Sequence, residues 1–227
     1  MHDIHVEAPE KFIDIFGGIY VPTTMISAFL ATIVLVLLAA LVRIFVIPKF
    51  KDQPGRFQMI LEMAVDGVRS YTSSMVGNKV GQSLSPYIFT VALFLVINAF
   101  FELIGIRATM TDLNSTVALA LITFILIQVY AIRKKGLWGR IKGFGKPFTA
   151  LAPINLVTQL AIPVSLSCRL FGNILGGMIV MELLYNVAAL RWGLPAFLSI
   201  YFTLFHTFMQ TFIFITLSLT FIEESLD

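Results

Sequence analysis

Five long apolar segments restrict the fold of this chain more than any other feature of its sequence. A helix needs about 20 consecutive apolar residues to cross the hydrocarbon core of a bilayer. No segment alternates polar and apolar residues as membrane barrel strands do, and a helix satisfies its own backbone hydrogen bonds in lipid. We therefore predict an all-α integral membrane protein with five transmembrane helices, from apolar segments at residues 22–47, 86–106, 114–132, 152–190 and 195–222.

The composition excludes a soluble domain. Hydrophobic residues make up 58% of the chain and charged residues only 13%, whereas soluble domains carry about a quarter charged residues. The net charge of +3 is small, and no basic tail or aromatic and basic patch indicates nucleic-acid binding. The acidic N-terminus MHDIHVEAPEKF does not resemble a cleavable signal peptide. We treat residues 1–227 as a single membrane domain embedded in the lipid bilayer.

The linker at residues 48–85 is polar at both ends, but its middle has a helical pattern. In the stretch FQMILEMAVDGVRSY the apolar residues recur at helical spacing, at Phe57, Ile60, Leu61, Ala64, Val65 and Val68. Such a pattern predicts an amphipathic helix. The helix is expected to lie along the membrane surface, and a helix packed on a partner protein would have the same pattern.

The fourth apolar segment is too long for an upright span. At 1.5 Å per residue, its 39 or so residues would extend about 58 Å, against a hydrocarbon core of about 30 Å. The segment must therefore tilt steeply or break, and Pro163 offers a kink. Together with the fifth segment it is expected to form a long tilted hairpin over residues 152–222.

Basic residues predict the orientation of the chain. They gather in the linker 48–85 and in a second basic loop at residues 133–151, and basic loops stay on the cytoplasmic side. The N-terminal stretch 1–21 is therefore expected outside and the tail IEESLD inside. The basic residues of the two cytoplasmic stretches are Lys49, Lys51, Arg56, Arg69, Lys79, Arg133, Lys134, Lys135, Arg140, Lys142 and Lys146.

Arg169 is the one charge between Lys146 and Glu182, in the middle of an apolar segment. A charge at that depth costs roughly 3 kcal/mol or more, and a guanidinium stays charged at any attainable pH. Structural packing does not require a permanent charge, so Arg169 indicates function.

Polar residues form stripes near Arg169. At 100° per residue, Asn155, Thr158, Ser165 and Asn173 fall within about 40° of Arg169 on the same helix face. Thr203, His206 and Gln210 form a second stripe in the fifth segment by the same count. Two such stripes fit a hydrated path, and they also fit hydrogen bonds between helices. The glycines Gly172, Gly176 and Gly177 likewise fit either close helix packing within the chain or a surface past which a second protein slides.

No phosphate loop, cluster of metal ligands or catalytic nucleophile is recognisable, so we expect no enzyme activity in this chain alone and no cofactor or metal. A secondary transporter would also carry charges inside the membrane, but it usually shows paired repeats with broken helices, which are not evident here. A structural scaffold would explain the helices and glycines and would leave Arg169 without a use.

Four stretches resemble subunit a of the F-type ATP synthase, of the bacterial type. They are IPVSLSCRLFGNILGG at 162–177, MQTFIFITLSL at 209–219, TDLNSTVALAL at 111–121 and VINAFFELIGI at 96–106. The resemblance implies a stator in the bacterial plasma membrane that faces the c-subunit ring. It also implies contact with the b subunits of the peripheral stalk and nucleotide chemistry on the remaining subunits. Two half-channels would carry the coupling ion; protons are favoured and sodium is left open.

The resemblance also implies roles for individual residues. Arg169 would be the fixed cation that the ring carboxylates pass, since an opposite charge favours the ionised carboxylate. Asn173 and Gln210 match the family's polar partners of that arginine. Met178 and Thr203 stand where many relatives have a glutamate and a titratable residue. Glu182 and His206 are expected to replace that pair in the outer half-channel, joined by Glu102. The alternative for these three is a buried, hydrogen-bonded polar residue, and Glu182 falls about 220° from Arg169 around an ideal helix.

Overall fold

The computed structural model describes residues 12–15, 19–50, 55–104, 106, 109–144, 152–186 and 194–226. Apart from one short hairpin, its regular elements are helices, which confirms the predicted all-α membrane fold. The hairpin pairs β1 (Phe12–Ile15) with β2 (Ile19–Pro22) in antiparallel register and leads directly into the first helix. Strands of four residues each lie below the length at which a period-two pattern stands out, and the sequence analysis did not predict them.

The helices follow the five apolar segments and the amphipathic linker. Within the described residues, five helices are long and apolar enough to cross a membrane, as predicted. In chain order the helical elements are α1 (Thr23–Leu41), η1 (Val42–Val46), η2 (Ile47–Lys49), α2 (Arg56–Val76), α3 (Asn78–Leu103), η3 (Thr109–Thr111), α4 (Leu113–Phe144), α5 (Ala152–Asn186) and α6 (Leu194–Leu226).

Two glycines with positive φ explain where the helix boundaries differ from the prediction. Gly77 has φ 83° and separates α2 from α3, so α3 begins at Asn78, well before the expected residue 86, with Pro86 inside it. Gly136 has φ 73° and breaks α4, after which helix resumes as far as Phe144. Positive φ is accessible to glycine at little cost. The predicted basic loop at 133–151 is therefore helical over much of its length.

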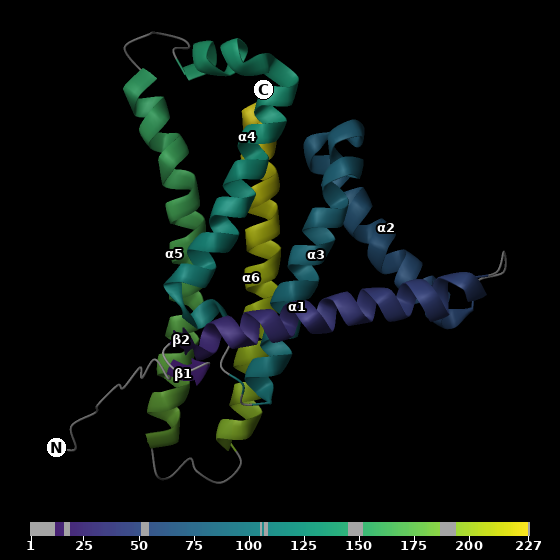
Figure 1. Cartoon of the computed structure of the whole chain (residues 1–227), viewed down its shortest axis with the longest axis vertical. Coiled ribbons are helices and arrows are strands. Elements are labelled where there is room, and N and C mark those ends of the chain that lie inside the picture. The colour runs from purple at the N-terminus through teal and green to yellow at the C-terminus, as the bar shows by residue number, and fades with distance from the viewer. Residues whose placement is uncertain are drawn as a thin grey trace.

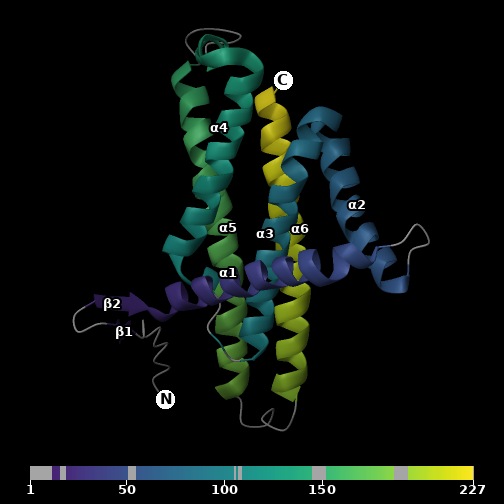
Figure 2. The same ribbon diagram turned by 45° about the vertical axis from the view of Figure 1, so that its right-hand side comes forward.

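Figures 1 and 2 show α3, α4, α5 and α6 running roughly side by side, while α1 runs across them. Helix α6 contacts α2, α3, α4 and α5, and α4 packs along α5. Helix α1 is the least enclosed span: 6% of its most apolar window is buried within the chain, against 33% for the spans of α3, α4 and α6. Its surface is therefore left to lipid or to partner subunits.

The direction of α1 across the other helices and the length of α5 both concern the predicted tilt of the α5–α6 hairpin. Helices that cross at such different directions cannot all stand upright in one bilayer. The 35 residues of α5 would extend about 52 Å, well beyond a hydrocarbon core of about 30 Å. The length of α5 agrees with a tilted α5–α6 hairpin, and the tilt itself stays a prediction.

The core is built from apolar residues spaced by three or four along neighbouring helices. Its fully or nearly fully buried members include Leu84, Ile88, Val91 and Leu95 of α3, Ile127 of α4, Ile162, Leu166 and Leu170 of α5, and Phe214, Leu219 and Ile222 of α6. Lipid tails are as apolar as these side chains, so close packing and hydrogen bonds between helices hold such a bundle together.

Hydroxyl and amide groups link the helices in pairs. The hydroxyls of Tyr87 and Thr123 join α3 to α4 at 2.7 Å, and those of Tyr71 and Thr216 join α2 to α6 at 2.8 Å. At the start of α4, Asp112 Oδ1 accepts the backbone N–H of Asn114 at 3.0 Å, which is an N-cap interaction. Asp112 Oδ2 accepts the hydroxyl of Thr24 at 3.2 Å and so ties α1 to α4.

Candidate functional site

Arg169 lies on the exposed side of α5. The buried residues Ile162, Leu166 and Leu170 recur every four positions and turn one side of the helix toward the bundle. Arg169 and its neighbour Cys168 lie on the exposed side. Among the described residues, Arg169 has no hydrogen bond or ion pair.

The glycines near Arg169 leave this side of α5 open. A Cβ atom built on Gly172, Gly176 or Gly177 would meet no atom within 4 Å. Gly81 of α3 is different, because a Cβ there would lie 2.5 Å from Cα of Ser73 on α2. Close packing within the chain therefore explains Gly81. It does not explain the three glycines of α5, which favours their reading as a surface for a second protein.

Asn173 and Gln210 meet between α5 and α6. The side-chain amide of Asn173 donates a hydrogen bond to Oε1 of Gln210. Gln210 is 4% exposed, and its own Nε2 has no protein partner among the described residues. The two residues that the resemblance assigned as partners of Arg169 thus form one unit, one helical turn along α5 from that arginine.

A small cavity with several polar side chains in an otherwise apolar lining lies beside this unit. Its lining includes Asn98 and Glu102 of α3 and His206, Gln210 and Thr211 of α6. Its volume of about 20 Å³ is enough for about one water molecule. Within the described residues, Nε2 of His206 and Oγ1 of Thr211 are buried without a protein partner, like Nε2 of Gln210. Three lining residues thus leave buried polar atoms unpaired, which is the setting in which a buried water binds.

Asn98 holds one wall of this cavity in place. Its amide nitrogen donates to the carbonyl of Phe94 at 2.8 Å, and its Oδ1 accepts the backbone N–H of Thr109 at 3.4 Å. The sequence analysis did not single out Asn98 or Thr211 as site residues. A buried amide within an otherwise apolar helix was the available signal for Asn98, whereas nothing in the sequence distinguishes Thr211 from the other threonines of α6.

The first predicted polar stripe is divided between the two sides of α5, and the second lies on α6. Ser165 lies on the exposed side with Arg169, and Thr158 is exposed with its hydroxyl bonded to the carbonyl of Ile154 at 3.0 Å. Asn173 instead turns to α6. In α6, Thr203 and Gln210 are buried and His206 is partly buried, so the second stripe faces the bundle.

Of the three predicted titratable residues, the structure brings Glu102 and His206 to the same cavity. Glu182 lies in α5, but its side chain is outside the part of the chain that the structure describes. No group of three His, Cys, Asp or Glu residues that could hold a metal ion occurs among the described residues.

Comparisons with known proteins agree on one family. The family model described as ATP synthase A chain matches residues 25–223. A relative from Desulforamulus reducens, named ATP synthase subunit a, is 30% identical over 95% of this chain and 83% of its own length. The subunit a of Moorella thermoacetica is 32% identical over 97% of each chain. A protein of Propionigenium modestum, named ATP synthase subunit a, sodium ion specific, is 34% identical over 76% of this chain and 64% of its own length.

Proposed function

This chain belongs to the ATP synthase subunit a family, and we propose that it is the stator against which the c-subunit ring turns, with Arg169 separating two ion half-channels. As a family member it is a multi-pass membrane protein and an ion-translocating component of the ATP synthase complex. The finer proposal adds its neighbours: the c ring along α5 and α6, and the b subunits of the peripheral stalk. ATP chemistry then takes place on other subunits.

The observation that carries the proposal is Arg169, exposed and unpaired within the described residues, beside glycines that leave open space. A ring carboxylate that passes this surface meets a fixed positive charge at close range. The opposite charge favours the ionised carboxylate, so the carboxylate releases its ion before it reaches Arg169 and takes up another after it. The arginine also repels a free cation, so ions do not leak directly from one half-channel to the other.

The cavity between α3 and α6 is our candidate for part of the outer half-channel. In the proposed orientation the N-terminus is outside and the two basic stretches and the C-terminus are cytoplasmic. Helix α3 then runs outward to Glu102, and α6 runs inward through His206 before it reaches Gln210. Both titratable residues thus lie on the outer side of Gln210. Glu182 follows Arg169 in α5, which also runs outward, and remains a proposed member of the same path.

We take the proton as the coupling ion. An imidazole takes up and releases protons through either ring nitrogen, and His206 has a buried ring nitrogen with no protein partner among the described residues. Hard cations such as sodium prefer oxygen ligands. ATP synthesis that needs a pH gradient but no sodium agrees with this assignment, and synthesis that needs a sodium gradient at constant pH contradicts it.

The decisive test is Arg169→Ala in the assembled complex, reconstituted in vesicles. We expect ATP synthesis driven by an ion gradient to be lost while the complex still assembles, because without the fixed cation the ring carboxylate is not kept ionised and ions leak between the half-channels. Val164→Ala, at an exposed position of α5 outside the polar stripe, is the matched control and should synthesise ATP normally. Normal synthesis by the Arg169→Ala complex would refute the proposal.

A further inference from the structure

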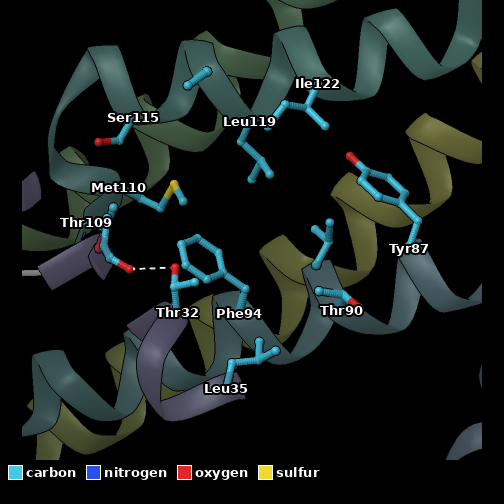
Figure 3. A pocket seen from close by; sticks show the side chains of 13 residues that line it. Thr32, Leu35, Tyr87, Thr90, Phe94, Thr109, Met110, Ser115, Leu119 and Ile122 are labelled. Carbon is cyan, nitrogen blue, oxygen red and sulfur yellow. Dashed lines mark hydrogen bonds between the residues drawn. The ribbon is translucent and has the colours of Figure 1, made fainter. Parts of the chain in front are cut away.

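Two features of the structure lie apart from the proposed ion path. One is a cavity of about 380 Å³ between α1, α3 and α4 (Figure 3). Its lining is mostly apolar, with walls that include Leu35, Phe94 and Leu119, and nothing in it identifies an occupant. The other is the end of α4, where basic and apolar side chains gather on the surface of the molecule.

The sequence RKKGLW, at residues 133–138, closes the candidate membrane span of α4, which runs from Leu113 to Gly139. From Leu113 to Ile132 the helix rises about 30 Å at 1.5 Å per residue, which is about the thickness of the hydrocarbon core. Residues 133–138 are therefore expected at the membrane surface. We call these six residues the basic-aromatic turn.

The side chains of the basic-aromatic turn point away from the bundle. Arg133 and Lys134 are exposed. Leu137 is 64% exposed and Trp138 82%, the highest value of any large hydrophobic side chain in the described part of the chain. Tryptophan is enriched where a membrane meets water, because its ring is apolar and its N–H is polar. The exposure of Trp138 thus has an explanation if its surroundings are lipid headgroups.

Gly136 separates the basic residues of this turn from the apolar ones. Its φ of 73° breaks α4, and Figures 1 and 2 show the last part of α4 turning across the end of the bundle. Arg133 and Lys134 lie in the last helical turn before the break, and Leu137 and Trp138 lie directly after it. The break therefore places two cations beside two exposed apolar side chains without burying either pair.

We propose that the basic-aromatic turn binds anionic phospholipids at the membrane surface, with Arg133 and Lys134 on the headgroup phosphates and Trp138 inserted beside the acyl chains. Residues 133–142 contain five basic residues, and clusters of about 4 to 8 next to a span are typical of binding to anionic lipid. The position at the end of a span favours lipid over a protein partner, because the bilayer already surrounds it. This proposal does not depend on the role of Arg169.

The test uses the intact ATP synthase complex that contains this chain, with photo-reactive benzoylphenylalanine in place of Trp138. The complex is placed in vesicles of equal parts phosphatidylglycerol and phosphatidylcholine and illuminated, and mass spectrometry measures the adducts of each lipid at position 138. We expect phosphatidylglycerol adducts to predominate. Their excess should shrink as salt is raised, because salt screens the attraction between exposed charges. Equal adducts of the two lipids at low salt would overturn the proposal, and so would cross-linking to another subunit in place of lipid.

Arg133→Gln tests the charged part of the turn in the same assay. We expect the ratio of phosphatidylglycerol to phosphatidylcholine adducts to fall about fivefold, the contribution of one basic side chain near an anionic surface. Arg56→Gln is the matched control: it makes the same change at an exposed residue at the start of α2, which Figure 1 shows away from the end of α4. It should leave the ratio unchanged. Equal ratios in the two variants would overturn the role of Arg133.

Trp138→Ala tests the apolar part, with benzoylphenylalanine in place of Leu137. We expect adducts of both lipids to fall severalfold, because an interfacial segment is held partly by the apolar area that it buries. The ratio of the two lipids should stay the same, since both cations remain. Trp138→Phe keeps an apolar ring and should retain most of the adducts. Equal yields from Trp138→Ala and from the chain that keeps Trp138 would overturn the insertion of this side chain.

Discussion

On the exposed side of α5, Arg169 has no partner among the described residues, whereas on the inner side Asn173 donates a hydrogen bond to Gln210 of α6. The exposed side also carries glycines with open space above them, while the inner side is filled by Leu166 and Leu170. Polar groups on the inner side thus find partners or a water-sized cavity within this chain. Under the proposed function, the exposed side serves assembly with the ring and the inner side serves ion access.

Among the variants that compare the two sides of α5, Arg169→Lys is expected to have the largest effect on ATP synthesis. It keeps a cation on the exposed side. An ammonium group can lose its proton when it is desolvated, whereas a guanidinium cannot. We expect ATP synthesis to fall about a hundredfold, because a lysine that has lost its proton leaves the ring carboxylate without its charge partner. The residual rate should decline further as pH rises, because lysine deprotonates. A full rate at every pH would show that any positive group suffices.

A large side chain at Gly176 tests whether the exposed side of α5 faces a moving partner. A Cβ atom built on Gly176 meets no atom within 4 Å, so we expect the Gly176→Leu chain to fold and insert normally. At a protein interface the added bulk costs about 1 to 3 kcal/mol, and we expect ATP synthesis to fall about tenfold. The measurement is synthesis in vesicles, together with the amount of assembled complex.

Gly81→Ala is the opposite control for Gly176→Leu. Its Cβ would lie 2.5 Å from the backbone of Ser73, so the cost falls on the packing of α2 against α3. We expect lower thermal stability and yield, with normal synthesis per assembled complex. If Gly176→Leu also acted only through yield, α5 would face this chain's own interior instead of the ring.

The sequence predicted the spans well because length and apolar content alone decide whether a segment crosses a membrane. It missed the start of α3 and the helical end of α4, because both depend on the φ angle of one glycine, Gly77 or Gly136. A prediction that treats proline and basic residues as helix ends has no means to detect either.

The candidate site was only partly predictable, for a different reason. Arg169 was identifiable because a charge within a span is costly wherever it points. The meeting of Glu102 with His206 depends on how α3 packs against α6, which local periodicity does not determine. Asn98 was passed over because its role is to bond Phe94 and Thr109, a contact that appears only in three dimensions.

The inner side can be tested through the cavity that Glu102 and His206 share. We expect Glu102→Gln and His206→Ala each to lower proton flux through the complex about threefold, since cavity water still carries part of the flux. If both residues act on one path, the double variant should lose less than the product of the single effects. Flux is measured across a range of pH, with exposed Glu223→Gln as the control. Unchanged flux in both single variants would place the entry path elsewhere, with Glu182 the next candidate.

The smallest effect is expected at Asp112, which directly precedes α4 and so belongs to neither side of α5. Its carboxylate caps α4 and accepts the hydroxyl of Thr24, so we expect it to serve folding and not ion transfer. Asp112→Ala should lower the free energy of unfolding by about 1 kcal/mol, the usual cost of a lost N-cap, and should leave proton flux unchanged. Asp112→Asn keeps a capping oxygen and should be nearly neutral, since asparagine caps helices about as well as aspartate. A loss of flux in the asparagine variant, without a loss of stability, would mean that the negative charge at the end of α3 and α4 belongs to the ion path after all.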